Sequence, residues 1–228
     1  SYVDLGWAFF EVCALYYFLL WFRKKNFKYL IFTGILIGLS ISVKIVAINS
    51  IFIFGFLILY LSLVNKESIG NILKNLLSLL FPAVIIPLPW LIFSFVNTGN
   101  PFYPLFESSI PLINNINVLN SLKMFINAPD PISPLYIIFL PLIVYIYKSQ
   151  TNYFKLLIIY SGIALSLWIS FSSIGGTRFL IPYLAVFSIL IAYVISAYKK
   201  KYSKLFLLSL VILVSVSSIG YRALANYK

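Results

Sequence analysis

The sequence predicts an all-α, polytopic integral membrane protein with about eight transmembrane helices and one larger extracytoplasmic loop. Of the 228 residues, 62% are hydrophobic and 10% charged, and the mean hydropathy is +1.01. Soluble domains are about half apolar and about a quarter charged. Runs such as 45–65 hold no charged residue at all, which indicates segments that cross a bilayer. We therefore expect residues 1–228 to form a single transmembrane domain.

Composition also excludes several classes of function. The net charge of +12 arises from basic residues in short clusters between apolar runs. Such clusters are explained by loop charges that orient spans, so no nucleic-acid partner is expected. The chain has no His, and its one Cys, Cys13, lies inside an apolar run. Histidine catalysis, haem ligation, disulfides and Cys/His zinc sites are therefore excluded within this chain.

Eight apolar stretches have roughly the length that crosses a bilayer, about 20 residues. They cover 5–22, 29–46, 48–64, 75–96, 132–147, 154–172, 179–198 and 204–221. The run 29–64 must hold two of them, because one helix over it would be about 54 Å long and the apolar core is about 30 Å thick. We expect a tight turn between Lys44 and Ser50. Gly34 and Gly38 form a GxxxG pair, which predicts close packing of their helix on a neighbour.

The basic residues also predict an orientation, since positive charge collects on the cytoplasmic side of membrane proteins. With two spans in 29–64, twelve of the 17 basic residues lie in cytoplasmic loops. These twelve are Arg23, Lys24, Lys25, Lys28, Lys66, Lys74, Lys148, Lys155, Lys199, Lys200, Lys201 and Lys204. The outer side holds the other five, with four of the five acidic residues: Lys44, Lys123, Arg178, Arg222, Lys228, Asp4, Glu11, Glu107 and Asp130. We therefore expect the polar chemistry on the extracytoplasmic face of the plasma membrane.

The largest segment outside the spans, 97–131, is rich in proline and lies on the expected outer face. Its apolar residues recur at helical spacing from Leu112 to Ile126, which is typical of a helix lying in the membrane interface. An irregular Asn-rich loop is the alternative. The span before this segment contains three prolines, which predict a kink. They are Pro82, Pro87 and Pro89.

Two acidic residues in the first span are candidates for chemistry. Asp4 stands at its outer mouth, and Glu11 follows seven residues later on nearly the same helix face, about 10 Å deeper. A carboxylate inside a membrane is costly, so it indicates a functional site by default. The alternatives are a helix N-cap for Asp4 and a structural hydrogen bond to a neighbouring helix for Glu11.

Two basic residues are candidate ligands for an anion. Lys44 ends an otherwise uncharged run on the outer side, and Arg178 follows two glycines at the outer end of another span. A guanidinium suits bidentate phosphate binding. The alternative for both residues is an anchor in the lipid headgroup region.

Four short segments, taken in order, resemble a known family: YVDLGWAFFE at 2–11, GLSISVK at 38–44, TGNPFYP at 98–104 and GTRFLIPYLA at 176–185. They resemble the multi-pass glycosyltransferases that use polyprenyl-phosphate sugars, the GT-C class. This class includes the dolichyl-phosphate-mannose protein mannosyltransferases and the lipid A aminoarabinose transferase. The resemblance covers roughly residues 2 to 185, and TGNPFYP is its most distinctive part.

The resemblance implies an extracytoplasmic site that transfers a sugar from a polyprenyl-phosphate donor to a lipid, glycan or protein acceptor, with inversion. It implies that Asp4 matches the acidic residue of the family at the outer start of a middle helix, and that Lys44 and Arg178 contact the donor phosphate. Asp4 and the intramembrane Glu11 are therefore our candidate catalytic residues. Asn100 and Tyr103 would shape the outer wall of the cavity. It assigns no metal ligands in this chain, although a divalent metal is left open.

The resemblance also places the principal catalytic acid of the family in a loop that would precede Ser1. We therefore expect an N-terminally truncated fragment that is inactive by itself, and in which Asp4 binds acceptor or metal. Two other classes of function stay open. One is a transporter or flippase of lipid-linked saccharides, which also needs interior charges and kinked spans. The other is a non-catalytic membrane subunit.

Overall fold

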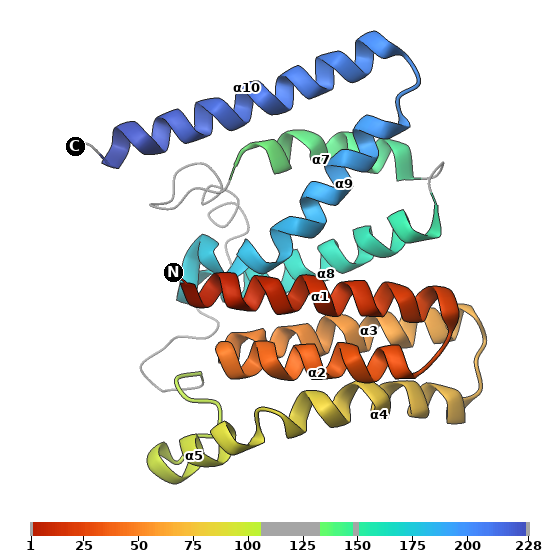
Figure 1. Ribbon diagram of the computed structural model, residues 1–228, viewed down its shortest axis with the longest axis vertical. Coiled ribbons are helices and arrows are strands. Elements are labelled where there is room, and N and C mark those ends of the chain that lie inside the picture. Colours follow the sequence, from red (N-terminus) through yellow and green to blue (C-terminus); the bar gives the residue numbers. More distant parts are fainter. Residues whose placement is uncertain (1, 106–132, 148–150, 227–228) are drawn as a thin grey trace. The chain divides into compact units, whose positions relative to one another are not determined.

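The computed structural model describes residues 2–105, 133–147 and 151–226, and in this part of the chain every regular element is a helix (Figure 1). The α-helices are α1 (Tyr2–Lys24), α2 (Lys28–Val43), α3 (Asn49–Val64), α4 (Ile69–Ile85), α5 (Leu88–Thr98), α7 (Leu135–Ile146), α8 (Asn152–Gly175), α9 (Leu184–Ala197) and α10 (Lys201–Asn226). Two 3₁₀ helices complete the set, η1 (Ile45–Ile48) and η3 (Gly176–Tyr183). The expectation of a helical fold is confirmed for these residues.

Five of the helical segments are long and apolar enough to cross a membrane. They are Val3–Lys24, Ile45–Val64, Asn152–Ser170, Thr177–Ala197 and Lys201–Gly220. The pair α4 and α5 makes a sixth if it is counted as one bent span. These helices indicate a membrane protein, but they do not amount to the eight spans expected. The shortfall arises because α2 and α7 have only 16 and 12 residues, whereas a span needs about 20.

Two breaks expected from the sequence are present in the structure. The run 29–64 divides where α2 ends at Val43, and η1 then leads into α3 at Asn49. The proline-rich span bends by 53° between α4 and α5. The bend follows Ile85, because Pro87 caps the next helix, while Pro82 stays inside α4 without breaking it.

The chain divides into two compact units. The first comprises the described residues of Ser1–Ile116 and Ile159–Leu184, and the second those of Asn117–Ile158 and Ala185–Lys228. In the first unit an aromatic core joins α1, α3 and α8: the ring of Phe54 lies 5.2 Å from Phe18 and 5.6 Å from Tyr160 between centroids. All three side chains are fully buried. This core fixes α1, which carries both candidate acids.

Close packing of α2 on α4 depends on the two glycines of α2. A Cβ added to Gly34 would lie 2.2 Å from the carbonyl oxygen of Leu79, and one added to Gly38 would lie 2.8 Å from Cβ of Ile86. No larger residue fits at this distance without a shift of the helices. The expected role of the GxxxG pair is confirmed, and the contact sets the position of α2 and of Lys44 at its end.

The second unit contains α7, the first turns of α8, nearly all of α9, and α10. Its rings pack in two places: Tyr136 lies 5.9 Å from Phe187, and Phe154 lies 5.3 Å from Tyr193. The hydroxyls of Tyr136 and Ser188 are 3.2 Å apart. The acidic residues that the structure describes all belong to the first unit, where the candidate site lies.

Candidate site at one end of the first unit

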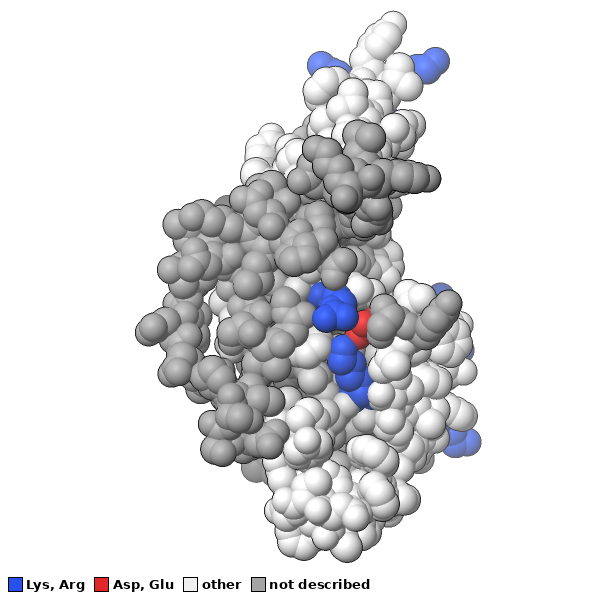
Figure 2. Space-filling view, turned by 90° about the vertical axis from the view of Figure 1, so that its left-hand side faces the viewer, with Lys and Arg blue, Asp and Glu red and all other residues white. Residues whose placement is uncertain are grey.

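Asp4 and Lys44 form an ion pair at the end of the first unit where α1 begins, which we call the Asp4 end. Asp4 lies in the first turn of α1, and Lys44 ends α2 with an extended backbone. The ammonium of Lys44 donates to Oδ1 of Asp4, and the side chain of Asp4 is only 3% exposed. Figure 2 shows basic groups beside an acidic group on one face of the molecule. The structure thus joins two predicted site residues that are 40 positions apart in the chain.

Two aromatic rings enclose the ammonium of Lys44. Its Nζ lies 4.4 Å from the ring centroid of Phe179 and 5.7 Å from that of Trp7. The two rings meet edge to face, with their centroids 6.4 Å apart. Aromatic faces attract a cation, and they also keep water from the ion pair. The lysine is therefore held in one position by a carboxylate and two rings.

Arg178 is brought to the same region by η3. This short helix packs against α1, and its residue Phe179 contacts Lys44 directly. Arg178 itself precedes Phe179 and is exposed. Both predicted basic residues therefore lie at the Asp4 end, one enclosed and one open to a ligand.

Glu11 lies deeper, and its carboxylate is buried between three helices. Ser50 of α3 donates to Oε2 at 2.6 Å, and Tyr160 of α8 donates to Oε1 at 2.5 Å. Glu11, Ser50 and Tyr160 are each 1% exposed or less. The expected alternative, a hydrogen bond to a neighbouring helix, is present. A catalytic role for Glu11 stays a prediction.

Two further polar side chains in this region were not expected from the sequence. The indole Nε1 of Trp7 and the hydroxyl of Tyr183 are buried without a hydrogen-bond partner in the part of the chain that the structure describes. Their rings touch edge to face at 5.9 Å, and Tyr183 also contacts Tyr160 at 6.1 Å. Such atoms are rare in native proteins. Trp7 and Tyr183 both belong to the quoted motifs at 2–11 and 176–185, which is the signal that could have identified them.

Asn100 and Tyr103 lie on a turn that follows α5. Gly99 ends the helix in the left-handed region, at φ 73°. The Asn100 side chain then holds the turn, since its Oδ1 accepts from the backbone N–H of Phe102 at 2.9 Å and its Nδ2 donates to the carbonyl of Leu105 at 2.5 Å. Tyr103 is 44% exposed. The structure gives Asn100 a local role, and a role in binding stays a prediction for both.

Other expectations concern residues that the structure does not describe. The predicted interfacial helix, Lys123, Glu107 and Asp130 lie outside the described residues. Among the residues that are described, no three Asp, Glu, Cys or His side chains come together as potential metal ligands.

The fold and this site define a helical protein with several apolar helices of transmembrane length and an enclosed ion pair at one end of its first unit. Comparisons of the chain with protein-family models, with curated proteins and with solved structures find no match.

Proposed function

We propose that this chain is part of a multi-pass glycosyltransferase of the plasma membrane, which works at the extracytoplasmic face. It transfers a sugar from a polyprenyl-phosphate-linked donor to a lipid, glycan or protein acceptor, with inversion at the anomeric carbon. The observation that carries this proposal is the Asp4–Lys44 ion pair, which lies where η3 also brings Arg178. An acid beside two cations is what this transfer needs.

The reaction needs positive charge where the donor breaks. The acceptor atom, a hydroxyl oxygen or an amide nitrogen, attacks the anomeric carbon, and the bond from that carbon to the phosphate oxygen breaks with its electron pair leaving on the lipid phosphate. Arg178 and Lys44 stabilise that developing charge, Arg178 through the fork of its guanidinium. Lys44 is held in position by Asp4, Trp7 and Phe179, so it needs no reorganisation when the donor arrives.

Asp4 supplies the carboxylate that binds the acceptor hydroxyl or amide at this end of the unit. In the family that the motifs resemble, the acceptor proton goes to an acidic residue of an outer loop, so we assign Asp4 to binding of the acceptor and not to removal of its proton. Glu11, held by Ser50 and Tyr160, fixes α1 below Asp4 and so positions that carboxylate. These roles explain why both acids lie on one face of α1.

A second function, a transporter or flippase of lipid-linked saccharides, is favoured by one specific observation. The helices α4 and α5 are bent by 53° at a short break. Discontinuous helices and intramembrane acids such as Glu11 are typical of transporters. Such a protein would move the donor across the bilayer and leave the sugar attached to its lipid.

The test reconstitutes the full-length gene product in proteoliposomes and measures sugar transfer from a radiolabelled polyprenyl-phosphate donor. We expect Asp4→Asn and Arg178→Ala each to lower the transfer rate about 100-fold, as the loss of a preorganised electrostatic contact does. Lys28→Ala is the matched control, because it removes a positive charge from the opposite end of the first unit and should keep the wild-type rate.

Wild-type rates for both site variants would show that the site is wrongly assigned. Movement of the donor to the other leaflet with no transfer would establish the flippase instead. Neither activity in a correctly folded full-length protein would favour a non-catalytic subunit.

A further inference from the structure

A second polar site lies at the opposite end of the first unit, where α1 ends, which we call the Lys25 end. It is a pocket with a volume of about 420 Å³. Its lining residues come from the end of α1, the turns that follow α1 and α3, and the first turns of α4: Trp21, Lys25, Phe27, Asn65, Glu67, Asn71, Lys74 and Asn75. The pocket is thus lined by two lysines, three amides, two aromatic rings and one carboxylate. None of these residues takes part in the proposed sugar transfer.

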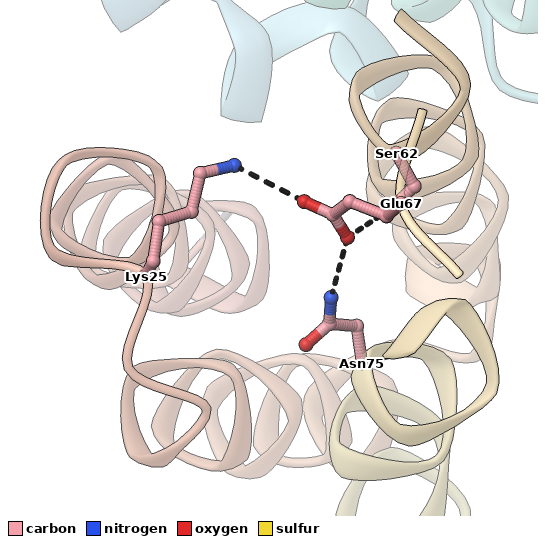
Figure 3. A network of polar contacts seen from close by, with 4 residues as sticks. All are labelled: Lys25, Ser62, Glu67 and Asn75. Atoms are coloured by element: carbon pink, nitrogen blue, oxygen red, sulfur yellow. Dashed lines mark hydrogen bonds and ion pairs between the residues drawn. The ribbon is translucent and has the colours of Figure 1, made fainter. Parts of the chain in front are cut away.

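A polar network surrounds the single carboxylate of this pocket (Figure 3). Oε2 of Glu67 accepts from the hydroxyl of Ser62 at 2.9 Å and from Nδ2 of Asn75 at 3.2 Å. The ammonium of Lys25 lies 3.5 Å from Oε1. Glu67 is therefore held in place by three polar partners, while the lysines add positive charge to the pocket and the amides offer both donors and acceptors of hydrogen bonds.

The two lysines of the pocket each lie over an aromatic ring. Nζ of Lys25 is 4.9 Å from the ring centroid of Trp21, and Nζ of Lys74 is 4.5 Å from that of Phe27. Lys74 forms no ion pair with a carboxylate of the described residues. Its charge remains available to a ligand, in a position that the ring helps to define.

The electrostatic surroundings of the pocket also favour an anion. Six basic residues lie at this end of the first unit against the one carboxylate of Glu67: Arg23, Lys24, Lys25, Lys28, Lys66 and Lys74. The helix α4 begins at the pocket, with Ser68 as its N-cap and Asn71 in its first turn. The positive end of a helix dipole adds to the attraction for a negative group.

The turns beside the pocket have an unusual backbone. Lys25 and Lys66 adopt left-handed conformations, with φ of 53° and 52°. Long side chains rarely adopt this region, and such residues tend to occur at functional sites. Here they turn the chain sharply after α1 and after α3, so that both turns contribute residues to the same pocket.

The exposed side of α4 indicates what kind of anion would bind. Exposed apolar residues follow one another at four-residue intervals along this helix: Ile69, Leu73, Leu77 and Phe81. Leu77 lies three residues after Lys74, so the apolar stripe adjoins the polar lining of the pocket on the helix surface. A ligand with a charged head and an apolar tail matches both surfaces at once, whereas a soluble anion uses only one.

We propose that this pocket binds the phosphate headgroup of an anionic glycerophospholipid, with an acyl chain along the apolar stripe of α4. Lys25 and Lys74 contact the phosphate, and the amides of Asn65 and Asn71 donate to its oxygens or to the glycerol hydroxyls. A basic pocket between membrane helices on the cytoplasmic side is a recognised setting for anionic lipids. The site is independent of the proposed sugar transfer.

The network predicts whether the loss of the Glu67 charge strengthens or weakens the binding of an anionic lipid. Glu67 is the one carboxylate among the residues that line the pocket, and it forms an ion pair with Lys25. Glu67→Gln removes this negative charge and should therefore raise the affinity for the anionic lipid. The same substitution weakens the polar contacts of Glu67 in the protein without lipid. Tighter binding in Glu67→Gln is an effect that a purely structural role of the cluster does not produce.

The experiment titrates the purified full chain in detergent with dioleoyl phosphatidylglycerol and, separately, with dioleoyl phosphatidylcholine, and counts bound lipids by native mass spectrometry. We expect one phosphatidylglycerol per chain, bound more tightly than phosphatidylcholine. Lys74→Gln should weaken this binding about fivefold, the effect of one lysine at a membrane surface. Glu67→Gln should tighten it about threefold by the same electrostatic reasoning.

Lys28→Gln is the matched control, since it removes the same charge at the same end from an exposed residue outside the pocket. Its affinity should fall much less than that of Lys74→Gln, because Lys28 adds to the general attraction for an anion but does not line the pocket. An equal loss in both lysine variants would show diffuse attraction and overturn the proposal. Equal binding of the two lipids, or weaker binding in Glu67→Gln, would also overturn it.

A competition experiment with inorganic phosphate and with glycerol 3-phosphate identifies the source of the phosphate group. If either compound displaced the bound phosphatidylglycerol at equal concentration, the ligand would be a soluble phosphate, which would overturn the lipid proposal. Each variant is checked for its helix content by circular dichroism.

Discussion

Each end of the first unit holds one lysine paired with one carboxylate, and the two pairs differ in how far water reaches them. At the Asp4 end the side chains of Asp4 and Lys44 are 3% and 22% exposed and in direct contact. At the Lys25 end the side chains of Glu67 and Lys25 are 18% and 45% exposed, and their nearest atoms are 3.5 Å apart. The same two chemical groups thus occur once enclosed and once open.

This difference suits two kinds of function. An enclosed pair interacts strongly, because little water screens it, and neither partner can leave without stranding the other charge. An open pair is screened and weak, so a ligand can compete for its lysine. The Asp4 end therefore has the fixed geometry that the proposed sugar transfer needs, and the Lys25 end leaves its lysine accessible to the proposed lipid.

The two ends are also separated by a distance that matches a bilayer. The helix α1 has 23 residues and is therefore about 34 Å long, close to the apolar core of about 30 Å. Its first turn carries Asp4, and its last turn carries Arg23 and Lys24. The concentration of positive charge at the Lys25 end is the pattern expected for a cytoplasmic surface.

The largest effect is expected from breaking the packing that both ends share. The helix α2 runs from the Lys25 end to Lys44, and Gly34 brings it against α4. In Gly34→Ala the new Cβ would start 2.2 Å from the carbonyl oxygen of Leu79. Because neither backbone can yield cheaply, we expect a loss of about 3 kcal/mol in the free energy of unfolding. The measurement is a denaturant titration in mixed micelles, followed by circular dichroism.

Gly55→Ala is the matched control for this prediction. Gly55 lies in α3, and an added Cβ there meets nothing within 4 Å. Alanine is the better helix former, so this variant should be as stable as the wild type or slightly more stable. Equal losses of stability in the two variants would show that glycine is needed for some reason other than close helix contact. The contact between α2 and α4 would then not explain how the Asp4 end and the Lys25 end are held.

A smaller effect is expected at Glu11, which lies between the two ends. Glu11→Leu removes the acceptor for the hydroxyls of Ser50 and Tyr160, which are buried on other helices. Stranding two buried donors should cost about 2 kcal/mol, since hydroxyls in membrane helices recover part of the loss through new partners. The same titration measures it. Glu11→Gln retains an oxygen acceptor and should lose less, so a glutamine variant that is the less stable of the two would contradict a structural role for these hydrogen bonds.

Much of the fold could be predicted from local sequence. The break after Val43 follows from the length of an uninterrupted apolar run, and the close packing of α2 follows from Gly34 and Gly38. Both predictions use only residues that are close together in the sequence. The bend beyond α4 was expected from its prolines. Pro87 and Pro89 lie at the start of α5, whereas Pro82 lies inside α4 and is tolerated there because neighbouring helices support it.

The site could be predicted only in part, because its contacts join distant parts of the chain. The charge pattern placed Asp4 and Lys44 on one side of the membrane, but their direct pairing depends on how α1 packs on α2. The contact of Glu11 with Tyr160 spans 149 positions, and no local pattern singles out one tyrosine among 17. The basic residues near Lys25 served only as an orientation signal, since a pocket arises from two turns folded together.

The smallest expected effect tests the comparison itself, through two double-mutant cycles. One cycle combines Asp4→Asn with Lys44→Gln, and the other combines Glu67→Gln with Lys25→Gln. The coupling free energy should be about 2 kcal/mol at the Asp4 end, where the carboxylate is enclosed, and about 0.5 kcal/mol at the Lys25 end, where solvent screens the pair. Added salt should lower the second value and leave the first nearly unchanged, because screening acts on exposed charges. Equal coupling free energies in the two cycles would mean that enclosure does not strengthen the ion pair of Asp4 and Lys44. The difference in solvent exposure would then no longer explain why Lys44 is held in place while Lys25 is proposed to bind a ligand.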